Sequence, residues 1–357
     1  MWGGREIVPC AAAVFAGNVI GDCLMPSPAL CLLLSLLMAS AALTFRKMFL
    51  MMAALAALGA ASVQISRMPP QARPSALSVA AADAKQHCSE YLEEILPPCS
   101  EETGVFKAMA VGDKSALDRE LKESYRSSGA MHLLALSGLH VGTIYGIVTL
   151  LMSFAGGSLF VRHARSVFTL VLLWMFAIMT GLSPSIFRAV LMITFYELSG
   201  LLGTDRDGPT ALASSALIIL LLQPEAPRDI SFQLSYSALI GIFVIYPRLS
   251  PLLKIKEGPV IFSRAAGRLL KYIWEAVCLS ISCQATCGML AYLHFGTFPR
   301  YFMITNLIAI PLATLVMYAI VAAVAASFIP ADIALPAELL RKALHLLNSA
   351  VRLIAEM

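Results

Sequence analysis

A serine and a histidine three residues apart are the first pair in this sequence that could do chemistry together. Ser137 and His140 lie in the segment SGLH, and their spacing permits contact on a helix. A serine nucleophile needs a base within hydrogen-bonding distance, but no oxyanion donors and no third catalytic residue can be named. We therefore rank an intramembrane hydrolase as a minor alternative and expect the protein not to be an enzyme.

A basic residue lies just inside another apolar segment, TGLSPSIFRA. Ser183 or Ser185 can cap the helix expected there, which places Arg188 one turn inside it. A cation at that depth is unfavourable unless it faces an aqueous path or an acid. Arg188 is therefore the best candidate for contact with a phosphate, and the alternative is a structural ion pair with Asp229 or Glu197.

Polar side chains also begin or line three further apolar segments. Asp229 precedes one of them, where capping is its simplest role, and Gln233 and Ser235 follow it closely. Gln284 belongs to LSISCQATCG, where polar residues recur at helical spacing, and Asn306 could add to the same cavity. Such a polar stripe either bonds to other helices or lines a channel.

Glycines at four-residue spacing follow the Ser137 segment. Gly138, Gly142 and Gly146 would form a ridge of small residues, and such ridges let a second helix approach closely. Packing is therefore the simpler explanation of these glycines.

Several motifs are missing. The sequence has no Walker A loop, no HxH or HExxH cluster and no pair of closely spaced intramembrane acids. We expect no metal, no cofactor, no ATP hydrolysis by this chain and no self-contained proton pump.

The elements that position these residues must lie in lipid. Of the 357 residues, 59% are hydrophobic and 13% are charged, whereas soluble domains carry about 25% charged residues. The apolar residues form blocks of roughly 17 to 25, the length that spans a bilayer. The prediction is an all-α, polytopic transmembrane helical bundle of about ten spans, with broken or re-entrant helices allowed at the short 209–222 segment and at Pro311. The spans are expected at 7–24, 28–44, 48–65, 132–154, 167–181, 185–202, 209–222, 231–246, 273–293 and 302–329.

Charge predicts the orientation. Lys and Arg collect in alternate loops if the N-terminus is cytoplasmic, as the positive-inside rule requires. The first apolar block is followed at once by two more, which favours a retained helical hairpin over a cleaved signal peptide.

Four regions follow from this pattern. We expect N-terminal transmembrane helices in 1–65, an extracytoplasmic helical connector in 66–129, a transmembrane channel domain in 130–330 and an amphipathic cytoplasmic helix in 331–357. Cys88 and Cys99 lie in the connector and could form a disulfide there, although two free thiols fit equally well. The net charge of +4 identifies no polyanionic partner by itself.

Four motifs, taken in order, resemble the ComEC-type competence proteins of bacteria. They are GDKSALDRELKESYRSSGAMHLLALSGLHVG, TGLSPSIFRAVLM, PRDISFQLSYSALIGIFVIYPRL and HFGTFPRYFMITNLIAIPLATL. The resemblance covers about 94–317, and the three preceding spans also resemble the N-terminal region of that family.

The resemblance implies that the chain is an inner-membrane channel through which single-stranded DNA enters during natural transformation. It implies a multi-pass protein of the bacterial cell membrane that contacts lipids and works with DNA-receptor and cytoplasmic helicase or strand-processing proteins; copies of the chain could also form a homo-oligomer. It places near the passage Ser137, Gly138, His140, Ser183, Arg188, Asp229, Gln233, Ser235, Phe295 and Asn306. A small-molecule or lipid transporter on the same bundle is the alternative.

The sequence departs from the family pattern in two places. The 66–129 segment is too short and too helical for the OB-like domain that full-length members usually carry, and no metallo-β-lactamase-like metal motif follows the membrane segments. DNA capture and strand degradation would then depend on other proteins. A reduced paralogue with another cargo, or a fragment of a split gene, is also compatible with these departures.

Overall fold

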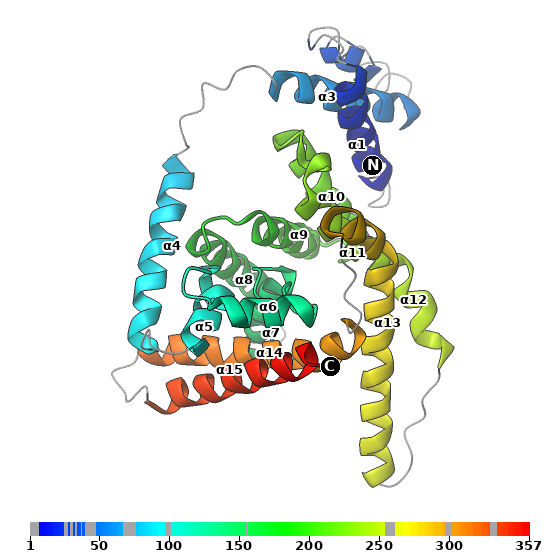
Figure 1. The fold of residues 1–357 in the computed structure, drawn as a ribbon. Coiled ribbons are helices and arrows are strands. Elements are labelled where there is room, and N and C mark those ends of the chain that lie inside the picture. The colour runs from blue at the N-terminus through cyan, green and yellow to red at the C-terminus, as the bar shows by residue number, and fades with distance from the viewer. Residues whose placement is uncertain are drawn as a thin grey trace. The chain divides into compact units, whose positions relative to one another are not determined.

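The computed structural model describes residues 7–24, 28, 31–32, 34–36, 38–39, 48–66, 76–96, 101–154, 156, 158–253, 261–296, 302–328 and 334–357. Over these ranges the secondary structure is helical and includes no strand (Figure 1), which confirms the all-α prediction. The chain forms two compact units. The first contains Met1–Ser75 and Leu191–Leu239, and the second contains Ala76–Val190 and Ile240–Met357.

The first unit is built on close contact between small residues. Its helices are α1 (Ile7–Leu24), α3 (Met48–Ser66), α10 (Gly208–Leu222), the short 3-10 helix η2 (Ala226–Arg228), the end of α9 (Pro184–Leu201) and the start of α11 (Ile230–Val244). A Cβ atom at Gly21 would lie 2.6 Å from the Cα of Ala60 on α3. Because only a glycine fits there, α1 and α3 approach backbone to backbone. Asn18 then ties α1 to α10 by donating to the Leu220 carbonyl at 3.0 Å.

The second unit contains the remaining helices. They are α4 (Ala76–Ile95), α5 (Glu101–Val111), α6 (Arg119–Ser127), α7 (Gly138–Ser153), α8 (Leu159–Met179), α12 (Tyr246–Leu249), the 3-10 helix η3 (Ser250–Leu252), α13 (Ile261–Phe295), α14 (Phe302–Ser327) and α15 (Ala334–Ala355), with the start of α9 and the end of α11. Its main apolar core joins α5, α6, α14 and α15. Figure 1 shows α14 and α15 lying side by side.

The amphipathic C-terminal helix covers this core. Leu340, Leu344 and Leu347 lie on one side of α15 and are fully buried, as expected for an apolar stripe with helical period. The buried hydroxyl of Tyr125 on α6 donates to Asn348 Oδ1 at 2.8 Å. The amphipathic helix predicted at the C-terminus is therefore present, and its apolar face packs on helices of the same unit.

This packing constrains the predicted membrane sides. Arg352 on α15 donates to both carboxylate oxygens of Glu101 on α5 at 2.7 Å, so α15 touches the segment predicted as the 66–129 connector. An extracytoplasmic connector and a cytoplasmic C-terminal helix would lie on opposite sides of a membrane. The membrane sides of the connector and of the C-terminal helix stay predictions.

The expected spans contain helices in the structure where they are described, but several of these helices differ from the expected spans in length. Four helical stretches of the described chain are long and apolar enough to cross a membrane: Leu159–Met179, Ile230–Leu252, Ala266–Phe295 and Phe302–Ser327. Four shorter apolar helices accompany them, and the 28–44 segment lies mostly outside the described residues. The expected count of about ten spans is thus not confirmed. α14 also continues through Pro311 without a break.

Candidate functional site

Ser137 begins α7 as its N-cap. Its hydroxyl accepts a hydrogen bond from the Leu139 N–H at 3.3 Å, and its own backbone N–H donates to His140 Nδ1 at 3.3 Å. This reciprocal capping satisfies backbone donors that a helix start leaves unpaired. The Ser137 hydroxyl and His140 Nδ1 are 3.1 Å apart, so the pair that suggested chemistry is engaged in starting the helix.

His140 is fully buried and keeps one ring nitrogen for another partner. Because Nδ1 accepts from the backbone, the neutral imidazole carries its proton on Nε2. Nε2 has no hydrogen-bond partner within the described residues. A buried donor without a partner loses about 1–3 kcal/mol, so an oxygen atom from a ligand or water would be favourable at this position.

A tight turn joins α8 to α9. The Leu182 N–H donates to the Ala177 carbonyl at 2.8 Å, and Gly181 and Leu182 both have positive φ, 72° and 52°. This geometry is typical of a helix C-terminus that ends on glycine. Ser183 follows at the start of α9, and its buried Oγ has no hydrogen-bond partner in the described part of the chain.

Arg188 lies one turn inside α9, as predicted, and is 6% exposed. Its Nη2 donates to Ser185 Oγ at 3.1 Å. A Cβ atom at Gly138 would lie 3.9 Å from the Cβ of Ala189, so the start of α7 lies against α9 beside the arginine. Glu197, one of its two predicted acidic partners, forms an ion pair with Arg206 at 2.7 Å.

The polar residues of α11 organise the turn that precedes it. Asp229 Oδ1 accepts from the Ser231 N–H at 3.0 Å, which is the expected capping role. Gln233 Nε2 donates to the Pro227 carbonyl at 2.7 Å, and Ser235 lies half-buried on the same helix. The three residues belong to the first unit, whereas Ser137, His140 and Arg188 belong to the second. That Asp229, Gln233 and Ser235 line a passage stays a prediction.

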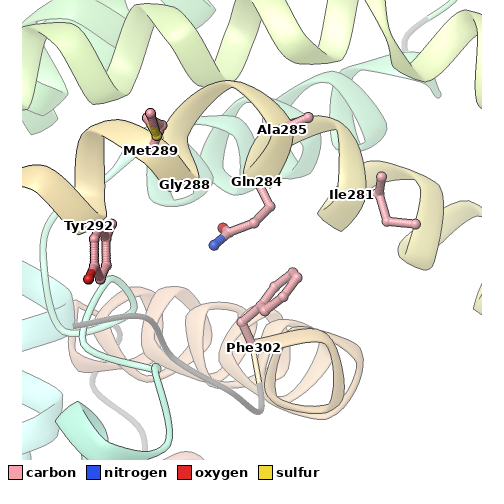
Figure 2. A pocket seen from close by; sticks show the side chains of 7 residues that line it. All are labelled: Ile281, Gln284, Ala285, Gly288, Met289, Tyr292 and Phe302. Atoms are coloured by element: carbon pink, nitrogen blue, oxygen red, sulfur yellow. The ribbon is translucent and has the colours of Figure 1, made fainter.

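A hydrogen bond between α13 and α14 supports the predicted polar stripe. Asn306 Nδ2 donates to Ser280 Oγ at 3.3 Å. Gln284, one turn beyond Ser280, lines a pocket of about 460 Å³ in which Figure 2 shows its amide and the Tyr292 and Phe302 rings pointing into a common space. Phe295, at the end of α13, is 60% exposed.

The other residues of this pocket were not predicted from the sequence. They are Ile281, Ala285, Gly288, Met289, Tyr292 and Phe302. The signal was present, because Ser280, Gln284, Gly288 and Tyr292 repeat every four residues and so share one face of a helix. The opposite wall, at Phe302, comes from another helix and could not be inferred from that spacing.

The glycine ridge of α7 does not serve close packing in the part of the chain that is described. A methyl group added at Gly142 or Gly146 would meet no atom within 4 Å. Cys99 lies outside the described residues, so its pairing with Cys88 stays a prediction.

A polar network at α4 and α5 was also not predicted. Lys107 is 6% exposed and lies 2.6 Å from Glu93 Oε1 and 3.6 Å from Asp113 Oδ2. Burial alone would raise the pKa of Asp113, but hydrogen bonds from Ser89 and Ser115 and the charge of Lys107 hold the pKa of this carboxyl well below its usual range. These groups anchor the connector to the core.

Comparison with known proteins gives one family and two curated relatives. The family model described as "Competence protein" matches residues 109–357. "ComE operon protein 3" of Bacillus subtilis is 31% identical over 160 residues, which are 45% of this chain and 20% of that protein. "Recombination protein 2" of Haemophilus influenzae is 27% identical over 152 residues, which are 42% of this chain and 19% of that protein. The matched parts thus cover about a fifth of those relatives, and no solved structure matches the chain.

Proposed function

Because this chain belongs to the competence protein family, we propose that it forms a membrane passage for single-stranded DNA during natural transformation. The similarity to two curated relatives supports this proposal. A carrier of small molecules or lipids, the alternative drawn from the sequence, is not favoured by this membership.

The observation that carries the proposal is the buried cation at the start of α9. Arg188 lies next to the N-terminal end of α7, and that end of a helix carries a partial positive charge. The nearby helix starts also hold two buried polar atoms, His140 Nε2 and Ser183 Oγ, that lack partners among the described residues. Phosphate oxygens of a passing strand would satisfy donors of this kind and offset the charge.

We propose a channel without catalysis. This proposal is supported by the capping of α7, in which the Ser137 hydroxyl and His140 Nδ1 both take part. The strand would then be drawn through by DNA-receptor, helicase or strand-processing proteins that act on either side of the membrane.

The proposed location is the bacterial inner membrane with the N-terminus in the cytoplasm. Loop charge supports this orientation. The contact between α15 and α5 supports the further proposal that α15 lies on the same membrane side as the connector, which would be extracytoplasmic. Labelling of Leu339→Cys, an exposed position on α15, by a membrane-impermeant thiol reagent in intact cells would support this side. Labelling only after the cells are opened would contradict it.

Transformation frequency tests the function. The gene is deleted and then complemented with wild type, Arg188→Ala, Arg188→Lys or Arg162→Ala. Arg162 is an exposed arginine on α8 and serves as the matched control. We expect wild type and Arg162→Ala to restore transformation, Arg188→Lys to restore part of it because the charge remains, and Arg188→Ala to fail.

Membrane insertion is measured in parallel by the amount of each variant in the membrane fraction. Arg188→Ala at normal abundance with no transformation supports a cation on the DNA path. Unchanged transformation after the deletion would contradict the proposed function.

A further inference from the structure

One hydrogen bond between α13 and α14 positions the pocket between them, because pocket residues lie one helical turn from the bonded residue on each helix. Asn306 lies one turn beyond Phe302 on α14, and Ser280 lies one turn before Gln284 on α13. The Asn306–Ser280 bond of 3.3 Å therefore sets Phe302 opposite Gln284, since residues four apart share a helix face. The pocket is continuous with the polar stripe already assigned to the candidate passage.

The Gln284 amide has room and no hydrogen-bond partner among the described residues. Its Nε2 donates no hydrogen bond to any described residue. A Cβ atom at Gly288 would lie 3.1 Å from this Nε2, which is tighter than ordinary van der Waals contact, so the glycine one turn away leaves space for the amide. The amide offers both a donor and an acceptor to a ligand.

Two aromatic rings complete the pocket. Tyr292 is 54% exposed, and its ring points into the same space as the Phe302 ring and the Gln284 amide (Figure 2). The volume of about 460 Å³ falls within the range usual for small-molecule sites. The walls are therefore mostly flat and apolar, and their hydrogen-bonding side chains are the Gln284 amide and the Tyr292 hydroxyl.

This combination discriminates between ligand classes. A lipid acyl chain would cover the rings but leave the Gln284 amide unpaired, at a loss of about 1–3 kcal/mol. A phosphate would find no cation among the residues that line the pocket. A nucleobase has a flat face for the rings, and stacking on aromatic rings is how proteins hold single strands without sequence preference. Its edge also offers donors and acceptors to the amide.

We propose that this pocket binds a nucleobase of the single strand, with the Tyr292 and Phe302 rings against its face and the Gln284 amide at its edge. The inference rests on the proposed function, because it assigns base contacts to α13 and α14 and leaves phosphate contacts to Arg188.

Oligonucleotide binding to the full chain in lipid nanodiscs tests this assignment. The dissociation constant is measured for a fluorescent single-stranded thymidine oligomer and for an abasic phosphodiester of the same length. The variants are Tyr292→Ala, Phe302→Ala, Gln284→Ala and Gly288→Ala. The controls are Tyr272→Ala, another exposed tyrosine of α13, and Gly142→Ala, whose added methyl group meets no atom within 4 Å.

We expect Tyr292→Ala and Phe302→Ala each to weaken binding of the thymidine oligomer by about 5- to 150-fold, the range for loss of one stacked base. Gln284→Ala and Gly288→Ala should weaken it in the same direction, and abasic binding should stay unchanged in all four. The two controls should bind both oligomers like wild type.

Three results would overturn the inference. Wild type that binds the thymidine oligomer while all four variants bind it equally well would remove the pocket from the DNA path. Variants that lose only a bound spin-labelled phospholipid would make it a lipid site. Wild type that binds neither oligomer would contradict the proposed function itself, and the base site with it.

Discussion

The two sides of α14 differ in how completely the protein fills them. Ala309, Ala313, Val316 and Ile320 recur at helical spacing and are at most 5% exposed, because α5 and α15 pack on them. At its start, the same helix contributes Phe302 to an open pocket opposite α13. The packed side consists of small and branched apolar residues, whereas the pocket side of α14 places Phe302 opposite the Gln284 amide and the Tyr292 ring of α13.

This difference separates stability from function. A filled interface maximises buried apolar area, so changes there should unfold the protein. An open pocket contributes little to folding, so changes there should alter ligand binding and leave the free energy of unfolding nearly unchanged.

The largest effect is expected in the packed core. Leu344→Ala removes a fully buried side chain of α15 and should lower the free energy of unfolding by about 2–5 kcal/mol. Leu339→Ala, 56% exposed on the same helix, is the matched control and should change it much less. Denaturant unfolding in detergent measures both. Equal effects of the two variants would show that α15 does not pack as described.

The polar network at α4 and α5 should make the packed side sensitive to acid. The pKa of Asp113 is lowered in the folded protein, so its contribution to stability is complete above the unfolded pKa of about 4 and is lost as the pH falls below that value. Asp113→Asn should destabilise the protein at pH 7 by about 1–3 kcal/mol and flatten the acid side of the stability profile. If the stability of Asp113→Asn falls with acid pH as steeply as that of wild type, Asp113 does not have this role.

The α8–α9 turn should show a smaller effect. Gly181 has φ of 72°, and a Cβ atom there would lie 3.3 Å from the Lys85 Cδ. Gly181→Ala should lower stability by about 1–2 kcal/mol because of the left-handed backbone. Thermal unfolding measures this loss, with Gly142→Ala as the reference variant. If Gly181→Ala is as stable as wild type, the turn does not have this geometry.

The smallest effect is expected at the surface of the packed side. Arg352 pairs with Glu101, and both side chains are about 40% exposed. Exposed ion pairs contribute about 0–1 kcal/mol, so Arg352→Ala should change stability slightly and the change should shrink at high salt. A large, salt-independent loss would mean that the pair is more enclosed than its exposure indicates.

Local sequence patterns predicted the elements well. The expected spans at 7–24 and 185–202 agree with α1 and α9 to within a residue, because apolar blocks and capping residues mark helix ends. Other helix starts differ more: α7 begins at Gly138 instead of 132 and α8 at Leu159 instead of 167. The largest difference is that of α13. It begins at Ile261, twelve residues before the expected 273, because Arg264, Arg268 and Lys271 lower the hydropathy of a stretch that is still helical.

Contacts between distant segments could not be predicted in the same way. Arg188 was placed correctly inside its helix from the spacing alone. The partnership of α15 with α5, by contrast, joins residues far apart in the chain, and the charge pattern even assigned them to opposite membrane sides. Likewise, Gln284 was recognised by its polarity. Phe302 is one apolar residue among many, and its place in the pocket could be seen only from the contact between α13 and α14.

Photo-crosslinking of transforming DNA tests the central claim most directly. A photoreactive amino acid replaces Ser185, whose hydroxyl accepts the hydrogen bond from Arg188, or the exposed Leu339 of α15 as control. Cells are then illuminated during uptake of a labelled strand. If the strand passes beside Arg188, we expect a crosslink from position 185 and none from position 339. Transformation that proceeds normally with no crosslink at 185 would contradict a DNA path beside Arg188.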